Sequence, residues 1–171
     1  YSVVLGASAA AISLVLGVAL FLDAICDPLV GAFSDQVKSR LGRRHPLMYA
    51  ASIPMGVFIC LLFTPPQGLS ATSLIVWLAF FLIMTRITFT FFSVPWSALI
   101  AEFSDDYEQR TVIASYRTLI GPLLGGISST LILTFIFIGT PDIPKGQENL
   151  ENYNLFGPLI GSLMTGWALL S

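Results

Sequence analysis

Charged residues are scarce in this sequence of 171 residues: Asp, Glu, Lys and Arg make up 11% of it, whereas hydrophobic residues make up 55%. A soluble domain of this length has too small an interior to bury so much apolar surface. The composition therefore excludes an ordinary soluble fold and predicts a membrane protein. The formal net charge of -2 gives no indication of nucleic-acid binding.

Residues that could carry out catalysis are also few. The sequence has a single histidine, His45, and no glycine-rich phosphate loop, zinc-ligand spacing or nucleophile elbow. Its two cysteines, Cys26 and Cys60, lie in apolar stretches, where we expect free thiols without a disulfide. These absences predict a protein that is not an enzyme and that needs no cofactor.

Long apolar runs fill most of the chain. A membrane-spanning helix needs about 20 mostly apolar residues. We expect four spans and the start of a fifth, at residues 7–33, 46–63, 72–101, 112–138 and 155–171. The chain opens at Tyr1 without a signal peptide and stops inside an apolar run, so we expect both ends to be cut. The pattern predicts an all-α polytopic membrane protein.

Basic residues are concentrated in alternate loops. The loops after the first and third runs contain Lys38, Arg40, Arg43, Arg44 and Arg110, whereas the loops after the second and fourth contain only Lys145. Cytoplasmic loops of membrane proteins carry an excess of Lys and Arg. The first run is therefore predicted to cross from the outside to the cytoplasm.

The first of these loops has a second interpretation. Its charged and glycine residues could latch two helix ends together in one conformational state, or they could only anchor the loop in the cytoplasm. The residues concerned are Asp35, Arg40, Gly42, Arg43 and Arg44. The sequence leaves both interpretations open.

Two carboxylates lie inside the first apolar run. Asp23 and Asp27 are four residues apart, which places them on one helix face, one turn from each other. Each ionised carboxylate near the bilayer centre costs about 2.5–3.5 kcal/mol on insertion scales. The pair therefore predicts a cation-binding site, and the alternative is a structural pair that hydrogen-bonds to a neighbouring helix or reaches the cytoplasmic interface.

Arginines within the third and fourth runs are the matching positive groups. Arg86 is followed by Thr90, Ser93 and Ser97 at offsets that place all four side chains along one stripe of a helix. A guanidinium in this position needs an anion, which is Asp23, Asp27 or a group on a substrate. Arg117 lies close to the third loop, so it either snorkels to the interface or faces a polar cavity.

Small residues in the fourth run are a signal for close helix packing. They are Gly121, Gly125, Gly126, Ser128 and Ser129. Small residues at such spacing allow helices to approach each other closely in membranes.

Five segments match, in order and spacing, the motifs of one transporter family. They are residues 23–31 (DAICDPLVG), 39–46 (SRLGRRHP), 94–99 (VPWSAL) with Glu102, 105–111 (DDYEQRT) and 115–117 (SYR). In these segments the chain resembles the glycoside-pentoside-hexuronide:cation symporter family, the melibiose permease-like group of the major facilitator superfamily.

The resemblance implies a transporter with two six-helix halves. The chain would be a partial N-terminal half, with helices two to five and most of six, lacking the first helix and the C-terminal half. By resemblance, Asp23 and Asp27 match the cation-site carboxylates, Thr90 matches a cation contact on helix four, and Arg117 matches a sugar-site arginine. Arg86 and Ser93 are further candidates for substrate binding.

The chain departs from melibiose permease at two points. Cys26 stands where that protein has Asn, and the loss of an oxygen ligand leaves proton coupling open beside sodium coupling. Ser93 and Ser97 stand where it has a sugar-binding Asp and a Trp. With this acidic anchor absent and Arg86 added, an anionic solute such as a uronide or a sulfated sugar fits the charges better than a neutral galactoside.

Together these features predict a cation-coupled secondary transporter of the plasma membrane. It would move a sugar or sugar derivative with Na+ or H+ by alternating access. Two other functions stay open: transport of a lysolipid or another amphiphile, and a non-transporting membrane scaffold or sensor in which the buried charges only pair with each other.

Overall fold

The chain folds into helices, as the composition predicts. The computed structural model describes residues 1–37, 44–102, 107–139 and 143–170. The long helices are α2 (Ala9–Gln36), α3 (His45–Phe63), α4 (Ala71–Glu102), α5 (Tyr107–Phe135) and α6 (Leu150–Leu170). The short ones are α1 (Ser2–Leu5) and the 3-10 helix η1 (Gly146–Glu148). The all-α fold class is confirmed.

Four of the long helices are long and apolar enough to cross a membrane. They are α2, α3, α4 as far as Leu99, and α5 from Thr111. Each long helix contains one internal proline, and the polar groups that a proline frees are tolerated in membrane helices where neighbours satisfy them again. The chain is a multi-pass integral membrane protein.

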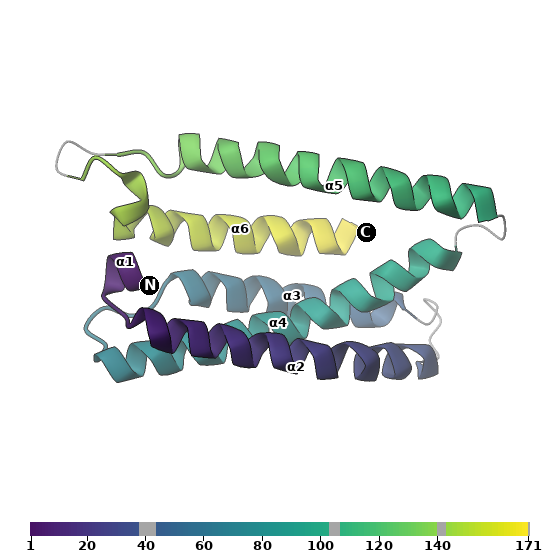
Figure 1. Ribbon diagram of the computed structural model, residues 1–171, viewed down its shortest axis with the longest axis horizontal. Helices are drawn as coiled ribbons and strands as arrows, with labels where there is room; N and C mark the ends of the chain where they lie inside the picture. The colour runs from purple at the N-terminus through teal and green to yellow at the C-terminus, as the bar shows by residue number, and fades with distance from the viewer. Residues whose placement is uncertain (38–43, 103–106, 140–142, 171) are drawn as a thin grey trace.

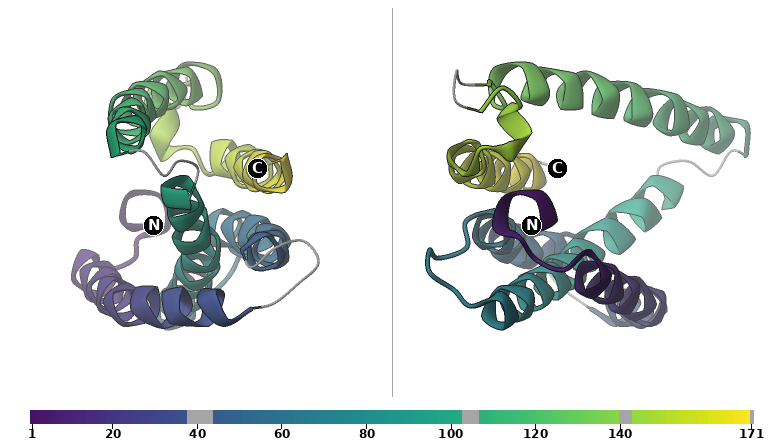
Figure 2. Two further views of the ribbon diagram at one scale, coloured as in Figure 1. Left: turned by 90° about the vertical axis from the view of Figure 1, so that its right-hand side faces the viewer. Right: turned by 60° about the vertical axis from the view of Figure 1, so that its left-hand side comes forward.

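Helix α4 occupies the middle of the bundle. It packs against α2 on one side and α3 on the other, and α3 also packs against α6. Figure 1 shows these four helices lying along the long axis of the molecule, and Figure 2 shows α4 crossing between α2 and α3. This arrangement brings the third predicted span next to the first, which is the contact that forms the polar site described below.

Small residues allow α3 and α6 to approach each other closely. Gly157, Gly161 and Thr165 recur every four residues on one face of α6, as membrane helix interfaces often require. A Cβ atom at Gly56 of α3 would lie 2.6 Å from the carbonyl oxygen of Gly161. The Thr165 hydroxyl donates a hydrogen bond of 3.2 Å to the carbonyl of Ser52. Larger side chains at either glycine would therefore force the helices apart.

The hydrophobic core lies where α3 meets α6 and α4. Met55 and Ile59 of α3 and Ala168 of α6 are buried together, and Phe92 of α4 packs against them. The indole N–H of Trp77 on α4 donates a hydrogen bond of 3.0 Å to a carbonyl near the end of α3. These contacts hold α4 in a defined register beside its neighbours.

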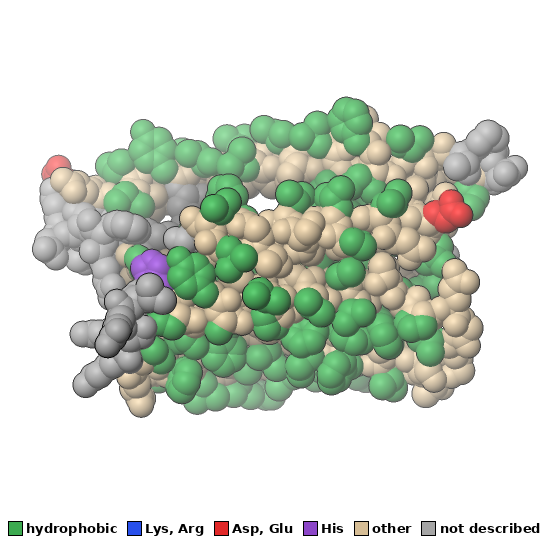
Figure 3. Space-filling view, turned by 180° about the vertical axis from the view of Figure 1, so that it is seen from behind, with side chains coloured by type: hydrophobic (Ala, Val, Ile, Leu, Met, Phe, Trp, Pro, Cys, Tyr) green, Lys and Arg blue, Asp and Glu red, His purple; other side chains and the backbone are tan. Residues whose placement is uncertain are grey.

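Helix α5 lies apart from this core. Figure 1 shows it as the outermost helix, and its contacts with the other helices are few, with α4 the main neighbour among the described residues. Within the described part of the chain, no atom of another element lies within 4 Å of a Cβ built at Gly121, Gly125 or Gly126. Figure 3 shows hydrophobic side chains over much of the face seen from behind, as expected of a surface that meets lipid or further protein.

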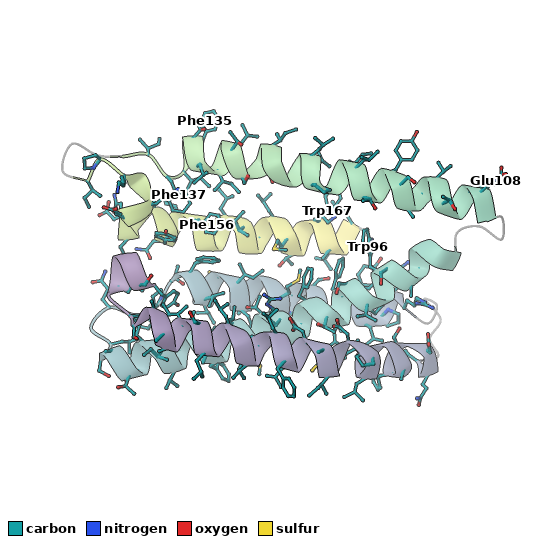
Figure 4. All side chains as sticks on the ribbon, viewed as in Figure 1. Trp96, Glu108, Phe135, Phe137, Phe156 and Trp167 are labelled. Atoms are coloured by element: carbon teal, nitrogen blue, oxygen red, sulfur yellow. The ribbon has the colours of Figure 1, made fainter. Side chains whose placement is uncertain are left out.

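One asparagine and a cluster of aromatic rings hold the connection between α5 and α6 against the start of α6. The Asn152 amide donates hydrogen bonds to the carbonyls of Ile138 at 3.2 Å and Gly146 at 2.8 Å. The rings of Phe137 and Phe156, both labelled in Figure 4, meet at a tilt of 51° with their centroids 5.6 Å apart. These contacts position the start of α6 under the end of α5.

We expect Asn152→Ala to lower the free energy of unfolding by about 1–3 kcal/mol, because the buried carbonyl of Gly146 and the partly buried carbonyl of Ile138 lose their donor. The matched control is Asn154→Ala, two residues along α6 with an exposed side chain, which should change stability by less than about 0.5 kcal/mol. Thermal unfolding of the purified protein in detergent measures both. Equal effects of the two substitutions would show that the Asn152 hydrogen bonds do not hold this connection.

Candidate functional site between helices α2 and α4

Polar side chains form a ladder of two rungs between α2 and α4. In the first rung, Arg86 Nη1 donates to Asp23 Oδ2 at 2.9 Å. In the second, the Thr90 hydroxyl donates to Asp27 Oδ1 at 3.1 Å. Both rungs join residues that are 63 apart in the sequence. Since each helix contributes residues four apart, the rungs are stacked one turn apart along two helices that run in the same direction.

The same register continues toward the C-terminal ends of the two helices. A Cβ atom at Gly31 would lie 3.7 Å from Val94, and these residues are also 63 apart. Phe33 and Phe91 meet edge to face with ring centroids 6.5 Å apart. The apolar contacts below the ladder therefore hold its two sides in register.

The ladder lies deep within the spans. Counted from Ala9, Asp23 is residue 15 of the 28 in α2, and counted from Ala71, Arg86 is residue 16 of the 32 in α4. Asp27 precedes the end of α2 by nine residues, which is about 14 Å of helix at a rise of about 1.5 Å per residue. This depth argues against the alternative that Asp27 reaches the cytoplasmic interface.

The two carboxylates have different surroundings. The Asp23 side chain is 21% exposed and is neutralised by Arg86, whose own side chain is 39% exposed. Asp27 is exposed, and its partner Thr90 is only 4% exposed. Among the described residues, no basic side chain forms an ion pair with Asp27. The second rung is therefore an acidic group held by a neutral hydroxyl, as a cation ligand would be.

The other two residues of the predicted polar stripe on α4 form no hydrogen bond with α2 among the described residues. Ser97 donates its hydroxyl to the carbonyl of Val94 on its own helix, at 2.9 Å. Ser93 is partly exposed and forms no hydrogen bond with another described side chain. Arg117 belongs to α5, but its side chain lies outside the described part of the chain. The structure therefore brings together four of the predicted site residues, Asp23, Asp27, Arg86 and Thr90.

The predicted loop site is described only at its ends. Arg44 Nη2 lies 3.5 Å from Asp35 Oδ1, joining the end of α2 to the start of α3. An acidic residue at a helix C-terminus and a basic one at an N-terminus each oppose the helix dipole, so their pairing offsets both effects. Arg40, Gly42 and Arg43 lie outside the described residues.

One buried polar residue of α2 escaped the sequence analysis. Ser34 of α2 is 1% exposed, and its hydroxyl has no hydrogen-bond partner among the described residues. It follows Asp27 by seven residues and therefore lies on the same helix face. That spacing was the signal that could have identified it.

Comparison with known proteins identifies the chain. A model of the family described as MFS/sugar transport protein matches residues 1–171. The chain belongs to this family. The match confirms the predicted membership of the major facilitator superfamily and the resemblance to its cation symporters.

Relatives of the chain include symporters of several kinds. An uncharacterized symporter of Synechocystis is 30% identical over 149 residues, 84% of this chain and 27% of the relative. A putative glycoside/cation symporter of Escherichia coli is 28% identical over 170 residues, 99% of this chain and 35% of the relative. Sodium-dependent lysophosphatidylcholine symporter 1 of Xenopus tropicalis is 35% identical over 132 residues, 77% of this chain and 25% of the relative. The chain thus spans about a third or less of each relative's length.

Proposed function

We propose that the intact protein is a cation-coupled symporter of the plasma membrane that moves a sugar or sugar derivative together with Na+ or H+. The observation that supports this most is the polar ladder, which places two carboxylates of α2 against α4 in the middle of the spans. Ionisable groups at such depth commonly mark ion and substrate pathways. The activity is transport, and no catalytic step is involved.

The coupling cation binds in the ladder, at the carboxylates of Asp23 and Asp27 and beside the Thr90 hydroxyl. An unneutralised carboxylate is costly within a membrane protein, so it opposes closure of the surrounding cavity. Cation binding removes this cost and favours the closed conformations that carry the solute across. Ion and solute binding are then linked through one conformational equilibrium.

The solute binds beside the ladder, through Arg86, Arg117 and Ser93. A guanidinium has five N–H donors, and the Arg86 side chain is partly exposed while one nitrogen contacts Asp23. Its remaining donors are available to hydroxyl or acidic groups of a solute. Bidentate binding of carboxylates and sulfates suits arginine, which supports an anionic sugar derivative.

A second candidate solute is a lysolipid. The lysophosphatidylcholine symporter of Xenopus tropicalis is the relative with the highest identity of the three described above. Arg86 would then bind the phosphate of the headgroup, and the acyl chain would follow the apolar faces of the helices. A guanidinium can bind an acidic group of either solute, and the uptake experiment separates them.

Uptake by the purified intact protein in liposomes tests the proposal. The solutes are a neutral glycoside, a uronide, a sulfated sugar and lysophosphatidylcholine, each offered under an inward sodium gradient and under an inward proton gradient. We expect gradient-driven uptake of a sugar derivative, with the uronide or sulfated sugar preferred. Uptake of lysophosphatidylcholine alone would select the second candidate, and no uptake of any solute would favour a scaffold or sensor.

A further inference from the structure

Only one of the two carboxylates in the ladder has a positively charged neighbour. Asp23 already has a cation beside it, because the Arg86 guanidinium lies 2.9 Å from its Oδ2 atom. Asp27 has only the neutral hydroxyl of Thr90, at 3.1 Å. A threonine hydroxyl orients a carboxylate but supplies no charge. The ladder as a whole therefore has two negative groups, one positive group and a net charge of about one negative unit.

The carboxylate without a positive neighbour is also the more exposed of the two. Asp23 is partly buried between α2 and α4, whereas Asp27 is exposed and accepts its one described hydrogen bond from a buried residue. An incoming ion can reach the free oxygen of Asp27 without breaking a contact. To bind Asp23 directly, the same ion would have to displace the guanidinium.

We propose that Arg86 acts as a tethered cation that occupies Asp23, so that the site binds a single monovalent coupling cation, held by Asp27 and Thr90. This inference rests on the proposed function and refines it: Asp27 is the carboxylate that binds the ion, and Asp23 is the counter-charge of Arg86. Arg86 thereby limits the site to one ion and lowers the affinity for that ion.

The electrostatic consequence follows from the stacking of the rungs. The Arg86 charge lies about one helical turn from an ion at Asp27, and like charges at that separation repel each other appreciably at the effective dielectric constant of a protein site. Removing the charge should tighten binding of the first cation by about 10- to 100-fold. It also leaves Asp23 without a cation, so a second ion should bind there.

Equilibrium cation binding to the purified intact protein tests this proposal. Bound Na+ is counted with choline as the control cation, and proton uptake is counted in a parallel titration. The number of ions bound by Asp27→Asn is the background count, and subtracting it from the count for another variant gives the number bound at the ladder. The informative variants are Arg86→Gln, which removes the charge, Arg86→Lys, which keeps it, and Asp23→Asn/Arg86→Gln, which removes both members of the first rung and leaves no unpaired charge there.

We expect the unsubstituted protein and Arg86→Lys to bind about one cation at the ladder, and Arg86→Gln to bind about two, the first at least about tenfold more tightly. The doubly substituted protein should still bind one cation. If Arg86→Gln does not fold, this last result decides: loss of ion binding in the double variant would make Asp23 an ion ligand and overturn the proposal.

Three other results would also overturn it: two cations bound without substitution, an Arg86→Gln variant with unchanged affinity and number of ions, and an Asp27→Asn variant that binds as the unsubstituted protein does. If Arg86 and Asp23 form only a structural ion pair, Arg86→Gln should leave the affinity and the number of bound ions unchanged. If the proposed symport function is wrong but this proposal is right, one ion binds at Asp27 and no solute accumulates under an ion gradient.

Discussion

Replacing Asp27 by Asn is expected to reduce gradient-driven uptake at least about 100-fold at low cation concentration. The carboxylate is the charged ligand of the proposed ion site, and an ion close to a carboxylate at the effective dielectric constant of a protein gains several kcal/mol from it, of which about 2.7 kcal/mol corresponds to a factor of 100. Asparagine keeps the shape and an acceptor for the Thr90 hydroxyl, so the helices should remain together. Initial rates of uptake in liposomes measure the effect.

The matched control for this experiment is Glu151→Gln, which also replaces a carboxylate by an amide. Glu151 is exposed in the first turn of α6, outside the ladder. Surface substitutions away from buried contacts usually change stability by less than about 0.5 kcal/mol, so uptake should change less than about fivefold. Equal losses in both variants would indicate a general effect on folding or orientation, and an active Asp27→Asn variant would rule out Asp27 as the ion ligand.

Gly161→Val is expected to have the largest effect on the fold. A Cβ atom at this position would lie 2.5 Å from the carbonyl oxygen of Gly56, closer than side-chain atoms approach backbone. The helices must separate to admit it, which disrupts the close contact between α3 and α6. Overpacking commonly costs about 1–3 kcal/mol and more where backbone must move, so the folded fraction recovered in detergent should fall severely.

Gly166→Val is the matched substitution, because it lies on the same helix and a Cβ atom there meets nothing within 4 Å among the described residues. It should leave the yield of folded protein and the unfolding temperature close to those of the unsubstituted chain. Size-exclusion profiles and thermal unfolding compare the two variants. If both glycines tolerate valine equally, the packing of α6 on α3 described above is incorrect.

The fold class followed directly from the sequence because it depends on local composition. Apolar runs of spanning length predict helices wherever they occur, and α2 through α6 lie along the five runs. Packing was harder to anticipate. Glycines and serines of α5 have the spacing of a helix interface, but among the described residues no atom of another helix lies within 4 Å of a Cβ built at the α5 glycines, whereas Gly56 and Gly161 form the close contact. Small residues permit close approach without specifying which helix approaches.

The sequence predicted which polar residues share a helix face, but not how the two helices pair them. Spacing alone placed Asp23 and Asp27 on one face of a helix and Arg86 and Thr90 on one face of another. Which carboxylate pairs with Arg86 depends on the relative position of α2 and α4, and that register is set by tertiary contacts such as Gly31 against Val94. The charge difference between the two carboxylates was therefore visible only in the structure.

The central claim is that an ion bound in the ladder drives solute transport. Its most direct test is accumulation of the transported sugar derivative by liposomes that contain the intact protein and start with no solute gradient. Under an inward gradient of the coupling ion, the internal concentration should rise above the external one and fall back when an ionophore collapses the gradient. Solute that only equilibrates, with or without the ion gradient, would contradict the claim.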